Sequence, residues 1–314
     1  MDLEPSPDQV ALVDELRRFL AARVPRPASA FPGVWDELAA MGVLTLPVPE
    51  PDGGVGLGWA EAALAFQALG HSGAAGPFVA TAAAAAAGLS SAVTTLVADH
   101  APARQVVVEH LDQIESLLVL RPDGVWRVDV PLAGARAVER PLDPLTPVHL
   151  VDALPRGEQV GDAALARLVA RHAALLAAAQ QVGLGAAAVE LATTYAGQRE
   201  QFGRPIGSFQ AVKHLLADAV VGIEVARAAV DAAAVTADEA SAPDDPTVER
   251  AVASARIVAS DAAQRATRAS IQVHGGMGYT WELNAHLHLK RVLVLDQTPS
   301  TVDDAIDALV GTAV

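Results

Sequence analysis

The stretch Tyr195–Gln210, which reads YAGQREQFGRPIGSFQ, separates two long segments whose apolar residues recur at helical spacing. The first segment carries a stripe from Leu165 to Ala179, and the second carries one from Val212 to Val230. Between them, Gly203–Gly207 combines glycine and proline, the residues that most often end helices. Two long helices joined by so short a connection lie antiparallel. The stretch therefore predicts a helical hairpin at the centre of a bundle.

A second stretch, Ile271–Glu282 (IQVHGGMGYTWE), ends another long helical pattern. That pattern covers Thr247–Val273 and follows the acidic turn Ser241–Pro246. A last short helix is expected at Val302–Leu309. Together these segments predict a C-terminal four-helix bundle over residues 161–314.

The N-terminal part of the chain predicts a separate helical domain over residues 1–100. Ser6 is followed by proline, as is typical of a helix N-cap, and Pro25 is expected to end that first helix. Further helices are expected at Gly33–Met41, at Trp59–Leu69 and in the alanine run Ala80–Ala87.

Residues 101–160 predict a reduced, β-rich middle segment. Strand-like Leu117–Leu120 and Val125–Val130 flank Arg121–Gly124, where Pro-Asp-Gly favours a tight turn, so we expect a hairpin here. The whole chain therefore predicts a mainly α fold with an N-terminal helical domain, a small β-rich insert and a C-terminal bundle.

Composition narrows the function classes. The 314 residues are 52% hydrophobic but only 4% aromatic, and much of that apolar content is alanine, which favours close-packed helices. The net charge of −15 argues against nucleic-acid binding, which needs clustered Lys and Arg. The chain has no cysteine and its N-terminus has no signal-peptide pattern, so we expect a cytoplasmic protein without disulfides. The uncharged stretch Ala74–Ala98 is interrupted by glycine, proline and serine, and predicts buried helices rather than a membrane span.

The two glycine-containing stretches also carry side chains suited to a dinucleotide. Arg199 beside a glycine turn fits phosphate oxygens with its guanidinium fork. Amide groups and aromatic rings stand in the same stretches, at Gln201, Gln210, Gln272, Phe202 and Phe209. Neither stretch is the G-x-G-x-x-G of a Rossmann fold, and the chain has no P-loop pattern.

Each of these residues also has a plain structural interpretation. The positive charge of Arg199 could interact with the negative end of the helix macrodipole. Gly275 and Gly276 could simply end the preceding helix. Phe202 and Gln210 could only pack at the end of a bundle. These alternatives stay open on local sequence alone.

At these residues the sequence resembles the acyl-CoA dehydrogenases. The pattern R-x-Q-F-G-x-P-I-x-x-F-Q at Arg199–Gln210 and the pattern Q-x-H-G-G-x-G-Y-T-x-E at Gln272–Glu282 look like two signatures of that family. The resemblance reaches the N-terminal region at Trp35–Leu38, Met41-Gly42, Pro47–Glu50, Gly53–Gly58 and Leu69-Gly70.

The resemblance implies FAD as cofactor, an acyl-CoA thioester as substrate and its 2,3-enoyl form as product. An electron-transferring flavoprotein is the acceptor that the family implies. In such enzymes these motifs reach across a subunit interface and hold the pyrophosphate and adenosine of a neighbouring subunit's FAD. Carried onto this chain, the cofactor-binding residues are Arg199, Gln201, Phe202, Gln210, Gln272, Gly275 and Gly276.

The chain departs from the family pattern at the segment that covers the flavin ring and at the catalytic glutamate. The T-E-P-x-A-G-S-D segment, which covers the flavin ring, has no counterpart in residues 101–160. The two positions used for the catalytic glutamate fall near Pro299 and near Ala173, which cannot take a proton. His172 and Asp296 are the nearby substitutes, and neither is assigned as a catalytic residue. No metal site is assigned either, because no carboxylate or cysteine completes a site around His286 and His288.

The sequence therefore predicts the smaller, base-lacking subunit of a heteromeric acyl-CoA dehydrogenase. Two copies would join two copies of a full-length partner in an α2β2 heterotetramer. The run TWELNAHLHLKR at Thr280–Arg291 resembles the small subunits that act on steroid CoA thioesters. Two alternatives remain: a self-sufficient homomeric dehydrogenase with an atypical base, and a non-catalytic assembly scaffold.

Overall fold

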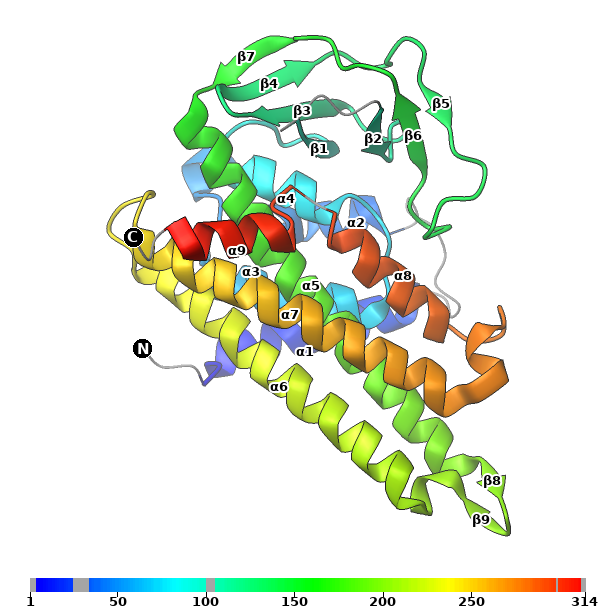
Figure 1. The fold of residues 1–314 in the computed structure, drawn as a ribbon. Coiled ribbons are helices and arrows are strands. Elements are labelled where there is room, and N and C mark those ends of the chain that lie inside the picture. The colour runs from blue at the N-terminus through cyan, green and yellow to red at the C-terminus, as the bar shows by residue number, and fades with distance from the viewer. Residues whose placement is uncertain (1–3, 25–33, 100–104, 298, 312–314) are drawn as a thin grey trace.

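The computed structural model describes residues 4–24, 34–99, 105–297 and 299–311 (Figure 1). A group of N-terminal helices, two small β-sheets and a long helical bundle follow one another along the chain, which confirms the mainly α fold. The expected helix end at Pro25, the expected helix start at Gly33 and the expected boundary after residue 100 lie outside the described residues.

The first N-terminal helix starts where local sequence directs it. Ser6 caps the first helix, since its Oγ accepts a hydrogen bond from the Gln9 N–H at 3.2 Å. The Gln9 side chain returns the contact by accepting from the Ser6 N–H at 2.8 Å, which completes a capping box. The elements are α1 (Pro7–Arg23), α2 (Trp35–Ala40), η1 (Val43–Thr45), η2 (Glu50–Asp52), α3 (Trp59–Ser72) and α4 (Phe78–Ala86).

The middle of the chain forms two sheets that share a core. Their strands are β1 (Thr94–Ala98), β2 (Val106–Glu109), β3 (Ser116–Arg121), β4 (Gly124–Val128), β5 (Arg136–Ala137), β6 (Val148–Val151) and β7 (Glu158–Gly161). One sheet has the order β1-β3-β4-β7 and the other β2-β6-β5. Val97, Val108 and Trp126 belong to one apolar cluster that draws on both sheets.

The expected hairpin is confirmed as β3 and β4, which pair antiparallel and close at Arg121 and Gly124. β1 runs parallel to β3, so the sheet already begins at Thr94. The division of the chain at residues 100 and 160 stays a prediction.

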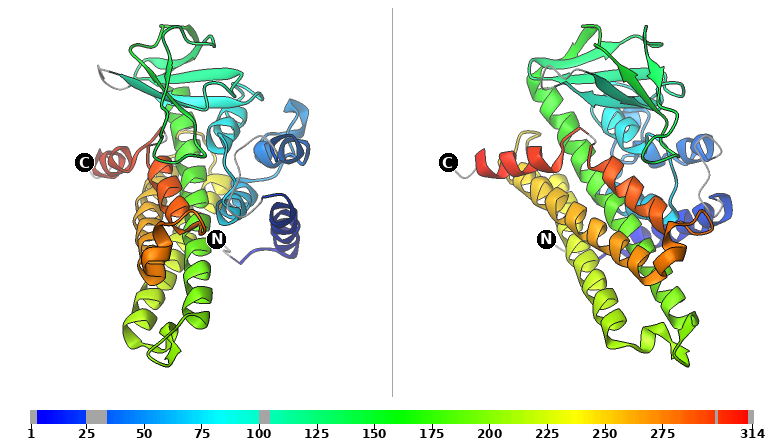
Figure 2. Two further views of the ribbon diagram at one scale, coloured as in Figure 1. Left: turned by 90° about the vertical axis from the view of Figure 1, so that its right-hand side faces the viewer. Right: turned by 45° about the vertical axis from the view of Figure 1, so that its right-hand side comes forward.

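The C-terminal part consists of long antiparallel helices (Figure 2). The helices expected around the two glycine-containing stretches are confirmed. One further helix, α8, was not expected from the sequence, and it packs on α5 and α7. The elements are α5 (Ala163–Gln198), β8 (Glu200–Gln201), β9 (Arg204–Pro205), η3 (Ile206–Ser208), α6 (Gln210–Glu239), α7 (Pro246–His274), η4 (Gly275–Tyr279), α8 (Ala285–Leu295) and α9 (Val302–Gly311).

Helix α5 is the central core helix. It is long and apolar enough to span a membrane by length and composition, but 83% of its most apolar window is buried inside the fold. α3 crosses it at very close range. A Cβ on Gly70 would lie 2.0 Å from the Gln180 carbonyl oxygen, and one on Gly183 would lie 2.0 Å from the Gln67 carbonyl oxygen. Both glycines are required for this approach.

The bundle also holds the N-terminal helices by a capping contact. α3 starts after Gly58, which offers no side-chain cap, and Asp238 of α6 supplies one. Its carboxylate accepts hydrogen bonds from the backbone N–H groups of Trp59 at 2.6 Å and Ala60 at 2.9 Å.

We expect Asp238→Ala to lower the free energy of unfolding by about 1–2 kcal/mol, the typical cost of losing a helix N-cap. Asp307→Ala, on the exposed surface of α9, is the matched control and should change stability by less than about 0.5 kcal/mol. Urea unfolding measures both. Equal midpoints for the two variants would contradict the capping role.

Candidate functional site

The two motif stretches meet at the end of the bundle that lies away from the sheets (Figure 1). The Tyr195 ring, near the end of α5, lies 4.5 Å from the His274 ring at the end of α7, measured between centroids. Val273 packs in one apolar cluster with Ala192 and Ala196 of α5. Residues about eighty positions apart are therefore held side by side by the helix packing.

The connection from α5 to α6 contains a β-hairpin, β8 and β9, with a two-residue turn. Glu200 pairs with Pro205 and Gln201 with Arg204, which leaves Phe202 and Gly203 at the turn. Both turn residues have positive φ, 53° at Phe202 and 76° at Gly203, as a type I′ turn requires. A bulky residue is strained in this conformation, and such strain is often found at functional positions.

The Phe202 ring projects into solvent at this turn. It is 93% exposed, so the interpretation as a packed core residue is wrong. Phe209 meets it edge to face at 6.2 Å between centroids, and the guanidinium of Arg204 covers the Phe209 ring at 4.1 Å.

All the expected cofactor-binding residues lie on the surface at this end of the bundle: Arg199, Gln201, Phe202, Gln210, Gln272, Gly275 and Gly276. Among the described residues, none makes a hydrogen bond or ion pair with the Arg199 guanidinium. Gln201 donates only to the neighbouring Glu200 carbonyl oxygen, at 2.7 Å. Nothing lies within 4 Å of a Cβ built on Gly275 or Gly276, so the backbone there is open to approach.

These features fit one side of a dinucleotide site. An uncommitted guanidinium suits a pyrophosphate, an exposed ring suits a flat base, and open glycine backbone allows close approach. The residues form an open face and do not enclose a ligand by themselves. A second surface would have to close the site.

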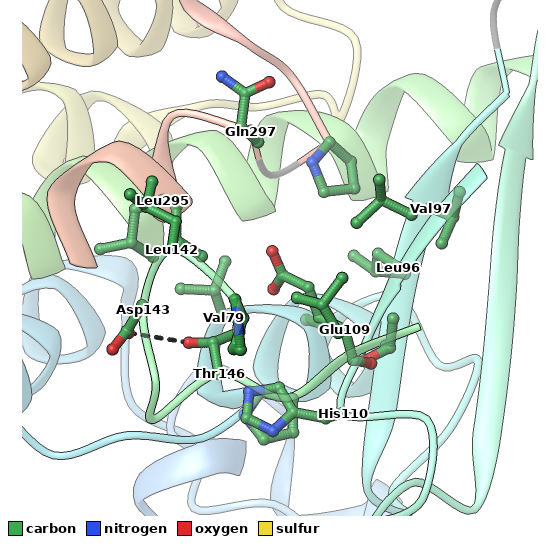
Figure 3. A pocket seen from close by; sticks show the side chains of 18 of the residues that line it. Val79, Leu96, Val97, Glu109, His110, Leu142, Asp143, Thr146, Leu295 and Gln297 are labelled. Carbon is green, nitrogen blue, oxygen red and sulfur yellow. Dashed lines mark hydrogen bonds between the residues drawn. The ribbon is translucent and has the colours of Figure 1, made fainter. Parts of the chain in front are cut away.

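A cavity of about 650 Å³ lies at the other end of the molecule, between the sheets and helices α4, α5 and α8 (Figure 3). Ala173 and Pro299 both line it. The structure thus brings together the two positions at which the motif register places the family's glutamate. Neither position carries a carboxylate in this chain.

Glu109 at the end of β2 is a carboxylate in this cavity that sequence reasoning missed. Figure 3 shows its side chain pointing into the hollow. Burial raises the pKa of the Glu109 carboxyl to about 7, while the charge of Arg291 opposes the rise and that of Asp143 adds to it. The only signal in the sequence was a lone acid after an apolar strand, VVVE.

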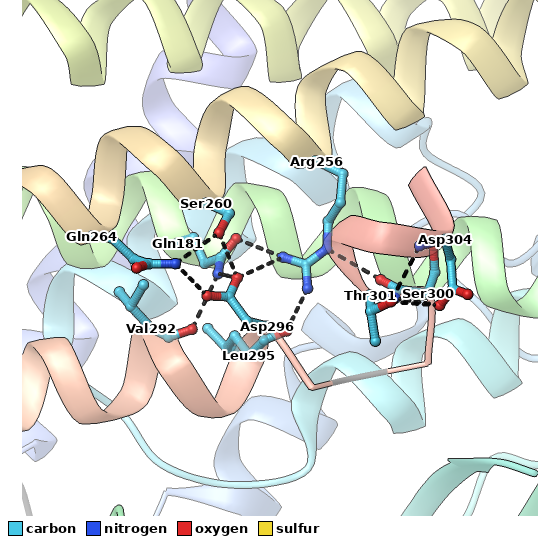
Figure 4. Close-up of polar contacts among 10 residues, drawn as sticks. All are labelled: Gln181, Arg256, Ser260, Gln264, Val292, Leu295, Asp296, Ser300, Thr301 and Asp304. Carbon is cyan, nitrogen blue, oxygen red and sulfur yellow. Dashed lines mark hydrogen bonds and ion pairs between the residues drawn. The ribbon is translucent and has the colours of Figure 1, made fainter. Parts of the chain in front are cut away.

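The carboxylate of Asp296 is held in a buried network (Figure 4). It accepts hydrogen bonds from Gln181 Nε2 at 2.7 Å, from the Ser260 hydroxyl at 2.7 Å and from Gln264 Nε2 at 2.8 Å. Arg256 adds an ion pair at 3.7 Å. With its oxygens committed in this way, Asp296 fixes the connection between α8 and α9.

His172 is also a buried structural residue. Its ring lies 4.2 Å from the Trp59 ring, and together they line a hollow separate from the cavity of Glu109. Burial lowers the pKa of His172 to about 3, and the nearby Arg171 charge lowers it further.

The low pKa of His172 predicts sensitivity to acid. Below pH 6.5 the unfolded chain takes up a proton at this residue while the folded chain does not, until the pH approaches 3. The free energy of unfolding should therefore fall by about 1.4 kcal/mol per pH unit in this range. His172→Phe should flatten that slope by about one proton in urea unfolding at pH 4.5–7, whereas His172→Phe with an unchanged slope would refute the prediction. His214→Phe, at an exposed position, is the control.

No metal centre is found within the described part of the chain, where no three His, Asp or Glu side chains gather as ligands. His286 and His288 are both buried at the start of α8. The His286 ring contacts Trp281 edge to face at 4.9 Å.

Comparison with known proteins agrees with this geometry. The pattern of the acyl-CoA dehydrogenase N-terminal domain matches residues 6–98, and that of the acyl-CoA dehydrogenase C-terminal domain matches residues 163–297. The acyl-CoA dehydrogenase IpdE2 of Mycobacterium tuberculosis is 37% identical over 263 residues, which cover 80% of this chain and 77% of that protein.

Solved structures share the fold at lower identity. One chain of the ChsE4-ChsE5 complex from Mycobacterium tuberculosis superposes with a TM-score of 0.81 at 22% identity, covering 100% of this chain and 98% of that one. A chain of the Tcur3481-Tcur3483 steroid ACAD superposes with a TM-score of 0.78 at 23% identity, covering 98% of each. The chain therefore belongs to the acyl-CoA dehydrogenases, a family of FAD-dependent oxidoreductases.

Proposed function

We propose that this chain is the smaller subunit of a heteromeric acyl-CoA dehydrogenase and lends half of a FAD site to a full-length partner. The observation that carries the proposal is the contrast between the two ends of the molecule. The motif residues form an intact but open face, while the cavity at the other end lacks a carboxylate at Ala173 and Pro299.

In this proposal the chain's own residues bind and orient. Arg199 would hold the FAD pyrophosphate, and Gln201, Gln210 and Gln272 would supply amide groups to it and to the adenosine. Phe202 would stack on a ring, and Gly275 with Gly276 would let the cofactor approach the backbone. When bound, FAD supplies the hydride acceptor for α,β-dehydrogenation of an acyl-CoA. Because this chain lacks the usual base, the partner would remove the α-proton.

The proposed substrate and partner rest on similarity to other members of the family. The run at Thr280–Arg291 and the similarity to a steroid ACAD support a steroid-derived thioester as substrate. The ChsE4-ChsE5 complex, which joins two differently named proteins, supports a partner of a different sequence. The α2β2 arrangement is our proposal. An electron-transferring flavoprotein in the cytoplasm is the acceptor that we propose.

Flavin content tests the proposal. We expect the isolated chain to bind little FAD and to leave acyl-CoA unoxidised, and the complex with a co-expressed full-length acyl-CoA dehydrogenase to hold FAD and turn over. A chain that alone binds one equivalent of FAD and oxidises acyl-CoA would establish the homomeric alternative. A complex whose flavin content and activity do not depend on this chain's motif residues would establish the scaffold.

Within the complex, we expect Arg199→Ala to weaken FAD binding by about 10- to 100-fold, because hydrogen bonds to a charged group contribute about 1.5–3 kcal/mol. Titration of the flavin-free complex with FAD measures the change. Arg250→Ala removes an exposed arginine at the opposite end of the bundle and is the matched control. Equal affinities for the two variants would contradict the role of Arg199.

A further inference from the structure

Two aromatic rings lie between the two arms of the open motif face. One arm follows α5 and carries Arg199, and the other follows α7, where Gly275 and Gly276 expose their backbone. The Tyr195 ring of α5 and the His274 ring of α7 lie 4.5 Å apart between centroids, tilted by 32°. His274 is only 3% exposed and Tyr195 is half-buried, so this contact lies inside the end of the bundle.

The first arm is tied to Tyr195 through the last turn of α5. The Arg199 N–H donates to the Tyr195 carbonyl oxygen at 2.8 Å, and residues four apart on a helix share one face. The hairpin folds back onto the same turn, since the Ile206 N–H donates to the Arg199 carbonyl oxygen at 2.7 Å. A shift of the Tyr195 ring is therefore transmitted to Arg199 over a single helical turn.

The second arm is tied to His274, the last residue of α7. The His274 Nδ1 lies 2.7 Å from the Ser270 carbonyl oxygen, which can only accept, so Nδ1 carries the proton and the ring is held against its own helix. Gly275 follows directly with a φ of 58°. Element η4 then folds back onto this turn, because a Cβ on Gly278 would lie 2.8 Å from the Ile271 carbonyl oxygen. The His274 ring and the glycine backbone therefore move together.

The separation of the two arms depends on the packing behind them. In the part of the chain that the structure describes, no hydrogen bond or ion pair joins residues 199–205 to residues 275–279. Ala192 and Ala196 contribute only methyl groups to their contact with Val273, whereas the two rings add large flat surfaces. Hydrogen bonds to a ligand weaken steeply when their geometry is lost, so the spacing of the arms decides whether both reach one molecule.

We propose that Tyr195 and His274 are positioning residues, whose ring contact sets the distance between Arg199 and the backbone of Gly275 and Gly276 at which both arms bind one dinucleotide. The inference rests on the proposed FAD half-site and deepens it. Both rings act on the cofactor only through the arms that they hold. Neither ring is assigned a contact with FAD or a step in the reaction.

FAD titration of the flavin-free complex with the full-length partner tests the ring contact. Tyr195→Leu should weaken FAD binding by about three- to tenfold, the usual contribution of one aromatic pair. Tyr195→Phe keeps the ring and should stay within about twofold of the wild type. His274→Leu removes the same contact from α7 and should match Tyr195→Leu, so a failure of one variant to assemble does not end the test. His274→Phe keeps a ring and should stay within about threefold.

Two further measurements separate positioning from general support of the bundle. In the Arg199→Ala background, Tyr195→Leu should weaken FAD binding by less than about twofold, because the arm that it places no longer binds. A purely structural ring pair would cost the same factor in both backgrounds. Trp59→Leu is the matched control, since it removes another ring contact with a histidine of α5, His172, at 4.2 Å and away from the motif face. It should lower the unfolding midpoint and leave FAD affinity within about twofold of the wild type.

Any of three results overturns the positioning role. These are wild-type FAD affinity in the Tyr195→Leu and His274→Leu complexes, an equal cost of Tyr195→Leu with and without Arg199, or an equal loss of FAD affinity in Trp59→Leu. Arg199→Ala tells the two proposals apart. Unchanged affinity in Arg199→Ala removes the FAD half-site itself, whereas weakened binding in Arg199→Ala with none in Tyr195→Leu removes the positioning role alone.

Discussion

Arg291→Met is expected to lower the free energy of unfolding by about 3–5 kcal/mol, the usual cost of breaking a buried ion pair by removing one partner. The Asp143 side chain is 0% exposed and that of Arg291 is 8% exposed, so the substitution leaves a carboxylate buried without its cation. It also removes the hydrogen bond to the Ala74 carbonyl oxygen. Because the pair joins α8, the β5–β6 connection and the segment before α4, the loss should loosen all three. Thermal unfolding measures it, with a fall in Tm of about 5–8 °C.

Two further variants show whether the uncompensated charge is the cause. Arg265→Met breaks an exposed pair with Asp261, whose side chains are 77% and 59% exposed, and should cost less than about 1 kcal/mol. Adding Asp143→Asn to Arg291→Met removes the unpaired charge and keeps an acceptor for the Thr146 hydroxyl. The double variant should recover stability relative to Arg291→Met. A double variant that is no more stable than Arg291→Met would contradict the explanation.

Arg256→Met is expected to cost a similar amount, about 3–5 kcal/mol, for a different set of contacts. Arg256 is 0% exposed and donates at 2.6 Å to both the Gln181 side-chain oxygen and the Leu295 carbonyl oxygen. It also reaches the carbonyl oxygen of Ser300, a non-glycine residue with φ of 77°. Without Arg256 these acceptors and Asp296 lose their buried cation.

The effect of Arg256→Met should be visible at one place in the fold. We expect faster amide hydrogen exchange at Ser300 and Thr301, because the strained backbone there loses its anchor. Exchange within α6 at neutral pH should rise less. Arg268→Met, an exposed arginine of α7, should leave both regions unchanged. Uniform acceleration across the chain would show that the network has no local role.

The long helices were predictable because each carries its own apolar period and its own stop signal. Helix α8 was missed because Leu287, Leu289, Leu293 and Leu295 alternate with other residues at a period of two, which is typical of a strand. Packing on α5 and α7 overrides that local pattern, and His286 and His288 become buried together with Leu287 and Leu295.

The motif surface after α5 and the cavity near β2 also differ in how far they could be predicted from the sequence. Arg199, Gln201 and Phe202 stand together in one short motif, so the sequence alone could group them. Glu109 is local to β2, but its neighbours in the cavity come from α4, α5 and α8. The pair of Asp143 and Arg291 is separated by 148 positions. Without the tertiary fold, an acid after three valines could not be distinguished from the edge of a strand.

Helix α5 sets the spacing between the two ends of the molecule. Ala173 stands beside the cavity near its start, and Arg199 follows directly after its last residue. At about 1.5 Å per residue, the 26 steps between them amount to about 39 Å. No single side chain bridges that length, so a fluorophore at one end senses nothing of a ligand at the other by direct contact. Labels placed at the two ends would thus give two separate signals in one sample, and a change in both signals at once would report a movement transmitted through the packed helices.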